Sequence, residues 1–108
     1  MNVFKLAEAL SLTPLATPEV DREVSGCYTG DLLSWVMGRA PADAAWVTIM
    51  TNINTVAVAT LTDVSMVIIA ENAEIAPDVI GKAREKGVNL YTSDKDAYTL
   101  CVELSQYV

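Results

Sequence analysis

The sequence predicts a small three-layer α/β domain, with a mainly parallel four-stranded sheet and helices on both of its faces. Runs rich in β-branched residues alternate with amphipathic helical patterns, which is typical of successive βα units. The run at residues 66–70 is apolar throughout, as a parallel strand covered on both faces requires. The chain has 108 residues, a common size for one domain, so we expect residues 1–108 to form a single unit.

The first third of the chain predicts a helix, a loop, a strand and a second helix. Residues 3–10 have apolar side chains at helical spacing, and residues 13–18 contain two Thr-Pro pairs that predict a loop. Residues 24–29 predict the first strand, and Asp31 is placed to cap the next helix. The predicted inward face of that helix is Leu32, Leu33, Val36, Met37 and Ala40.

The middle of the chain predicts a strand and a crossover helix. Residues 46–50 are aromatic and β-branched, which favours a strand. Residues 56–60 suit a strand by composition, but a crossover between parallel strands needs about a dozen residues or more, so we predict a helix there. Its predicted inward residues are Ile53, Val56, Ala57, Leu61 and Val64.

The last third predicts two more helices around the fourth strand. After the strand at residues 66–70, a helix begins near Pro77 and ends at Gly87, with basic residues in its last turns. Residues 88–91 predict the last strand, after which Ser93 or Asp94 caps a closing helix. The inward residues of that helix are Ala97, Leu100, Cys101 and Leu104.

The composition excludes several classes of function. The chain has 14 acidic and 7 basic residues, a net charge of −7, so nucleic acid and anionic membranes are poor partners. It has no histidine, which removes Ser-His-Asp and Cys-His catalysis and the commonest metal ligand. Its longest apolar run is far too short to span a bilayer, and residues 1–5 do not start a signal peptide, so we expect a cytoplasmic protein.

The two cysteines do not predict a metal or cofactor site. Cys27 and Cys101 are far apart in the sequence, and no CxxC pair is present. We therefore expect reduced thiols that act as small apolar groups, with Cys27 buried in its strand. No cofactor is predicted.

Polar residues follow each predicted strand, where parallel strands end along one edge of the sheet. They predict a crevice for a small polar ligand, although the same residues could simply cap helices. Asn54 is the strongest candidate, because asparagine is a weak helix former inside a first turn. Acidic neighbours favour a neutral or cationic ligand, or a nucleotide bound with a cation. The candidates are Thr29, Gly30, Asp31, Thr51, Asn52, Asn54, Glu71, Thr92, Ser93 and Asp94.

Two further hypotheses concern catalysis and self-association. Asp31 and Asp94 are the two acids from which an acid–base mechanism could be built. Both are better explained as caps, and we predict no catalytic residues and no enzyme. Trp35 points away from the apolar stripe of its predicted helix, and aromatic residues are common interface anchors, so we predict a homodimer with Trp35 at the contact.

Three strings resemble the DRTGG-domain family: GCYTGDLL at residues 26–33, WVTI at residues 46–49 and NTVAVA at residues 54–59. The resemblance extends over nearly the whole chain. The name-giving Asp-Arg-Thr-Gly-Gly string is absent, which indicates a divergent, stand-alone branch of the family.

The resemblance implies a fold similar to the N-terminal domain of HPr kinase/phosphorylase, where the domain is non-catalytic. Other members are attached to CBS-domain pyrophosphatases, and short stand-alone forms occur in anaerobes beside iron-hydrogenase components. The expected function is therefore a dimeric regulatory or interaction module of an anaerobic, hydrogenase-linked enzyme system. The alternative is a sensor that binds a small ligand such as a nucleotide at the strand ends.

Overall fold

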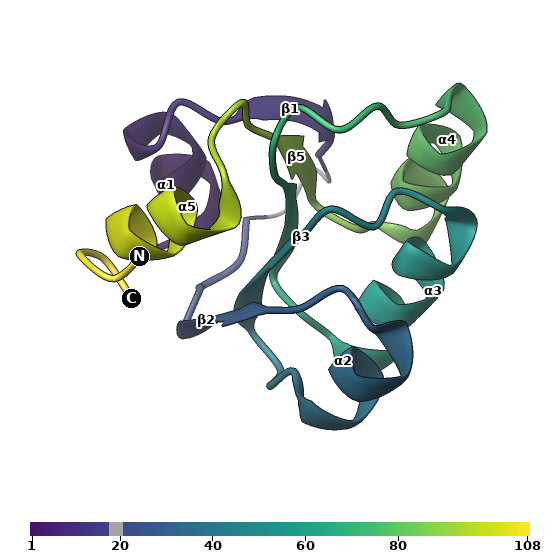
Figure 1. The fold of residues 1–108 in the computed structure, drawn as a ribbon, viewed down its shortest axis with the longest axis horizontal. Coiled ribbons are helices and arrows are strands. Elements are labelled where there is room, and N and C mark those ends of the chain that lie inside the picture. The colour runs from purple at the N-terminus through teal and green to yellow at the C-terminus, as the bar shows by residue number, and fades with distance from the viewer. Residues whose placement is uncertain (18–20) are drawn as a thin grey trace.

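The computed structural model describes residues 1–17 and 21–108 (Figure 1). Its helices are α1 (Val3–Ala9), α2 (Leu33–Arg39), α3 (Ile53–Thr62), α4 (Pro77–Lys86) and α5 (Ala97–Leu104). Its strands are β1 (Thr13–Ala16), β2 (Gly26–Thr29), β3 (Ala44–Thr48), β4 (Met66–Ile69) and β5 (Leu90–Thr92). Among the described helices, none is long and apolar enough to cross a membrane.

The strands form one sheet in the order β1-β5-β4-β3-β2. Strands β2, β3, β4 and β5 are parallel to their neighbours, whereas β1 is antiparallel to β5. From β2 to β5, each strand lies next to the previous one in sequence, and always on the same side of it. Because crossovers between parallel strands are right-handed, α2, α3 and α4 all cover one face of the sheet. Helices α1 and α5 cover the other face, which confirms the three-layer α/β prediction (Figure 1).

Strand β4 lies at the centre of both cores. Met66 and Ile68 pack toward α1 and α5, while Val67 and Ile69 pack toward α2, α3 and α4. All four side chains are at most 1% exposed. This confirms the prediction that the apolar run is a strand covered on both faces.

The sheet has five strands where the sequence predicted four. Residues 13–16, predicted as a loop, form β1, and Thr13 pairs with Thr92 of β5. Pro14 has no N–H to donate, and proline is tolerated in a sheet on an edge strand, which is where β1 lies. The second predicted loop position, Pro18, lies outside the described residues.

The predicted inward faces of α2 and α3 are partly wrong. Leu32 and Met37 are 63% and 50% exposed, while Val36 is buried. On α3, Leu61 and Ile53 are 70% and 43% exposed, and Ala57 is exposed as well. Both segments carry apolar residues on more than one side, so their spacing does not determine which side packs on the sheet. The buried side of α3 is Thr55, Val56, Val58 and Ala59.

Two helix caps also differ from the prediction. Asp31 does not cap α2, whose N-cap is Leu32, without a side-chain bond. Helix α5 is capped by Asp96, whose Oδ1 accepts from the Thr99 N–H at 2.8 Å, and not by Ser93 or Asp94. The hydrogen bonds with Thr99 hold the pKa of Asp96 below its ordinary value.

Arg22 joins the loops at the amino ends of the strands. Its guanidinium donates to Oδ1 of Asp43 at 2.6 Å and to Oδ1 of Asp63 at 3.0 Å. It also donates to the backbone carbonyls of Asp63 and Val64. Asp43 and Asp63 have φ values of 65° and 58°, a left-handed conformation that aspartate tolerates better than most residues. Arg22 therefore fixes two tight turns that are distant in sequence.

The two-sided burial of β4 predicts the effect of a charge at its centre. Ile68→Asp places a carboxylate in an apolar core, and we expect it to lower the free energy of unfolding by more than about 3 kcal/mol. The matched control is Leu61→Asp, on the exposed side of α3, which should cost no more than about 1 kcal/mol. Urea denaturation followed by circular dichroism measures both, and equal effects would contradict the three-layer arrangement.

Candidate functional site

The end of β2 is joined to β3 by side-chain hydrogen bonds. Oδ1 of Asp31 accepts from the Thr48 hydroxyl at 2.8 Å and from the Ile49 N–H at 2.9 Å. The Trp46 indole N–H donates to the Gly30 carbonyl at 2.9 Å. These bonds fix the loop after β2, so Asp31 holds two strands together and does not begin a helix.

A hollow of about 360 Å³ opens beside this loop, between β2 and α2. The Tyr28 ring packs over Gly30, where an added Cβ would lie 3.3 Å from a ring carbon, so glycine allows the close approach. Trp35 lines the same hollow and is 56% exposed, and the Arg39 guanidinium stacks over its ring at 4.0 Å. The lining residues are Tyr28, Thr29, Gly30, Asp31, Leu32, Trp35 and Val36.

A separate groove of about 370 Å³ runs between α3 and α4 and contains Asn54. Asn52 caps α3 by accepting from the Asn54 N–H at 2.8 Å, which leaves the exposed Asn54 side chain outside the cap. Lys82 and Lys86 lie on the opposite wall. Asn54 therefore shares its groove with two cations, whereas the sequence predicted a crevice shared with acids. The other lining residues are apolar or small: Ile53, Val56, Ala57, Thr60 and Leu61.

The ends of β4 and β5 border a third hollow, of about 410 Å³, lined by Thr92, Asn72 and Glu74. Glu71 and Asn72 have left-handed φ values of 59° and 52°. The Glu71 N–H donates to the Lys95 carbonyl at 2.8 Å, and the Asn72 N–H donates to the Ser93 carbonyl at 2.7 Å. These backbone bonds hold the loop after β4 against the loop after β5.

The predicted strand-end residues are thus not brought together in one crevice. Thr29, Gly30 and Asp31 line one hollow, Asn54 a second and Thr92 a third. The others line none of these hollows: Thr51, Asn52, Glu71, Ser93 and Asp94. In doubly wound sheets the ligand crevice opens where the strand order reverses. Here β2, β3, β4 and β5 follow one another without reversal, so neighbouring helices stay side by side. Ser93 accepts from the Lys95 N–H at 3.1 Å, and Asp94 is exposed. A role of these residues in ligand binding stays a prediction.

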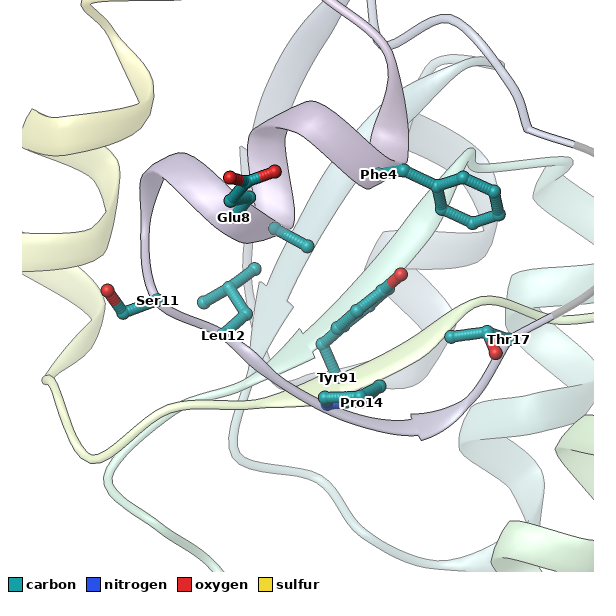
Figure 2. A pocket seen from close by; sticks show the side chains of 8 residues that line it. Phe4, Glu8, Ser11, Leu12, Pro14, Thr17 and Tyr91 are labelled. Carbon is teal, nitrogen blue, oxygen red and sulfur yellow. The ribbon is translucent and has the colours of Figure 1, made fainter.

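A fourth hollow, of about 350 Å³, lies on the opposite layer and was not predicted (Figure 2). It forms between α1 and β1, where the Tyr91 ring rises between Phe4 and Thr17. Burial, followed by the charge of Asp21, raises the pKa of Tyr91, so its phenol stays neutral. This hollow depends on β1, and the signal that could have revealed it is the compatibility of Pro14 with an edge strand.

The prediction that Cys27 is buried is wrong, because β2 is an edge strand and the residue is exposed. Its Sγ atom nevertheless faces α5, 3.9 Å from Sγ of Cys101. Removal of the thiol from water, together with the neighbouring Cys101, raises the pKa of Cys27 to about 12. Cys27 is therefore a neutral thiol near neutral pH, which does not suit a catalytic nucleophile.

No protein-family model matches the chain, and no curated protein matches it significantly. Among solved structures, it is similar to the CBS and DRTGG domains of the regulatory region of the Clostridium perfringens pyrophosphatase, which were crystallised with the activator diadenosine tetraphosphate. The TM-score is 0.72 at 13% sequence identity, over 96% of this chain and 46% of that chain. The protein has a DRTGG-like fold. The chain spans less than half the length of that regulatory structure.

The DRTGG-like sheet separates the two acids on which a catalytic hypothesis depended. Asp31 follows β2 and Asp94 follows β5, which are three strand spacings apart. At about 4.8 Å per spacing, the two strands lie about 14 Å apart. The Asp31 carboxylate is moreover bonded to Thr48 and Ile49 of the neighbouring strand end, so the two acids are not brought together as a pair. Within the described ranges, no group of three or more cysteine or acidic side chains could hold a metal ion.

The hydrogen bonds that Asp31 accepts from Thr48 and Ile49 should stabilise the fold. Asp31→Ala removes the acceptor of two hydrogen bonds and leaves the Thr48 hydroxyl without the acceptor of its proton, and we expect a loss of about 1–3 kcal/mol in the free energy of unfolding. Asp94→Ala, an exposed aspartate at the end of another strand, is the matched control and should change it by less than about 0.5 kcal/mol. Urea unfolding of the two variants measures both effects. An unchanged free energy of unfolding in Asp31→Ala would show that the loop needs no carboxylate.

Proposed function

We propose that this DRTGG-like protein is a non-catalytic regulatory and interaction module that self-associates through the outer side of its α2–α3 layer. The observation that carries the proposal is the exposed apolar surface there. Large apolar side chains normally pack inside, and groups of exposed ones mark interaction sites. Leu32 and Trp35 line the hollow beside β2, and Ile53 and Leu61 line the groove between α3 and α4. The apolar surface is defined here by five exposed side chains: Leu32, Trp35, Met37, Ile53 and Leu61.

The proposed occupant of the apolar surface is a second copy of the chain. With a net charge of −7, two copies repel each other through most of their surfaces. An apolar contact avoids much of this repulsion, and Trp35 supplies a large anchor whose ring is already held by Arg39. Trp35, the anchor predicted from the sequence, is one of these exposed side chains, which supports the proposal.

The similar Clostridium perfringens domains belong to the regulatory region of a pyrophosphatase, which supports a regulatory role for this fold. The dimer would then act on a partner enzyme. From the family resemblance, that enzyme belongs to an anaerobic, hydrogenase-linked system of the cytoplasm. Identification of the proteins that co-purify from the native host tests this part of the proposal.

Trp35→Ala should weaken the dimer. Truncation of a central aromatic anchor commonly costs about 2 kcal/mol or more of binding, which is about a 30-fold rise in the dissociation constant. Sedimentation velocity at tens of micromolar chain is the measurement. Tyr98→Ala is the matched control, because Tyr98 is an aromatic side chain that is even more exposed, on α5 of the opposite layer. A monomeric wild type, or a dimer that only Tyr98→Ala dissociates, would contradict the proposal.

The second candidate function is a ligand sensor, and the specific observation that favours it is the α3–α4 groove. Its apolar wall, the Asn54 amide and the cations of Lys82 and Lys86 suit an anion with an apolar body. A nucleotide has that chemistry. The activator in the similar structure, diadenosine tetraphosphate, is of the same chemical class.

Asn54→Ala tests the sensor hypothesis. Asn54 is exposed, so the variant should keep its stability within about 1 kcal/mol and lose the thermal shift that a nucleotide produces on the wild type. Differential scanning fluorimetry with a panel that includes diadenosine tetraphosphate and simple nucleotides provides the readout. Lys5→Ala, on the opposite layer, is the control and should retain the shift. If no compound shifts the wild type, or all three proteins respond equally, the groove is not the sensor site.

A further inference from the structure

The two cysteines, which were expected to be unrelated apolar groups, form a facing pair. Cys27 lies on the edge strand β2 and Cys101 on α5, and their Sγ atoms are 3.9 Å apart. Both thiols are free. Cys27 is exposed at the edge of the sheet, while Cys101 packs against the core beneath α5. The fold therefore brings together two residues from nearly opposite ends of the chain.

The separation is short enough for a disulfide to form after small movements. A disulfide needs an S–S distance of about 2.05 Å, so the sulfurs must approach by about 2 Å. Rotation of a cysteine side chain about its Cα–Cβ bond moves the sulfur by more than this. The sulfurs therefore start within reach of a side-chain rotation.

We propose that Cys27 and Cys101 are a redox site, at which a low-molecular-weight disulfide converts the two thiols into a reversible intramolecular disulfide. In the first step, the thiolate of the exposed Cys27 attacks the small disulfide, forms a mixed disulfide and releases one small thiol. In the second, the thiolate of Cys101 attacks Sγ of Cys27, forms the Cys27–Cys101 bond and releases a second small thiol. One small disulfide is reduced, two protein thiols are oxidised, and their two protons end on the two released thiols.

The pairing determines how the site behaves. The raised pKa of Cys27 keeps the thiolate scarce, so exchange is slow and isolated encounters with an oxidant leave the pair reduced. Once the mixed disulfide forms, Cys101 is already within contact distance, so ring closure competes well with the return of the small thiol. The site would therefore respond to sustained oxidising conditions.

The disulfide would change the stability of the module. It closes a loop that contains most of the chain, between β2 and the last helix, and a long closed loop constrains the unfolded state strongly. It would also tie α5 to the edge strand covalently. The protein would thus have a reduced form and a more stable oxidised form with the same fold.

The test is incubation of the full chain with excess oxidised glutathione at mildly alkaline pH. Intact mass spectrometry should show the loss of two hydrogens, thiol titration should fall from two thiols to none, and the melting temperature should rise by at least about 5 °C. Dithiothreitol should reverse all three changes. The controls are Cys27→Ser and Cys101→Ser, neither of which should lose two hydrogens or show the rise in melting temperature. Cys101→Ser should stop at a single glutathione adduct on Cys27, whereas Cys27→Ser should form less of the adduct, because Cys101 packs against the core.

Three results would overturn the proposal. The first is a wild type that keeps both thiols after oxidation while the urea-unfolded chain forms the disulfide. The second is a wild type that keeps a glutathione adduct, because Cys101 would then be unable to reach Cys27. The third is a covalent dimer on non-reducing electrophoresis, because the bond would then join two chains. The single-cysteine variants distinguish this last result from an intramolecular bond.

Discussion

The direction in which the strands are added is the constraint on which most of this structure depends. From β2 to β5, each strand lies beside the previous one on the same side, in the spatial order β5-β4-β3-β2. Right-handed crossovers then put α2, α3 and α4 on one face. The other face is left for the segments outside this series, α1 and α5 (Figure 1). Strand β4 becomes central in both directions and must be apolar on both sides.

The same constraint determines where ligands or partners can be accommodated. A reversal of strand order would separate two helices and open a crevice at the strand ends. Without one, polar side chains are used within the fold: Asp31 bonds to the end of β3, and Ser93 bonds within its own loop. The accessible spaces lie instead between adjacent helices and beside edge strands, and one of them combines Asn54 with Lys82 and Lys86. The helix layer, more than the strand ends, thus carries the chemistry available for recognition.

The sequence predicted those features that local patterns encode. The apolar run of β4 and the Pro77 and Gly87 boundaries of α4 were correctly located, since burial on both faces and helix termini leave marks in a few adjacent residues. The buried faces of α2 and α3 were predicted only in part, because apolar residues lie on more than one side of both helices.

The candidate site was hardest to predict, because its geometry comes from long-range contacts. The bonds of Asp31 to β3 and the approach of Cys27 to Cys101 join residues whose proximity exists only after the sheet has formed. In the edge strand β1, Pro14 gave a local signal for a loop that tertiary pairing with β5 overrode. Local propensity and final structure therefore differ most where the sheet, and not the neighbouring sequence, determines the conformation.

Both ends of the described chain belong to the layer of α1 and α5. Val3 and Val108 pack into the same hydrophobic cluster, and the Met1 carbonyl accepts from the Val24 N–H. The N- and C-terminal ends both lie beside α1 and α5 (Figure 1). Any segment joined to either end is therefore joined at the face of the sheet that α1 and α5 cover. The exposed side of α2, α3 and α4 lies on the other side of the sheet from both ends.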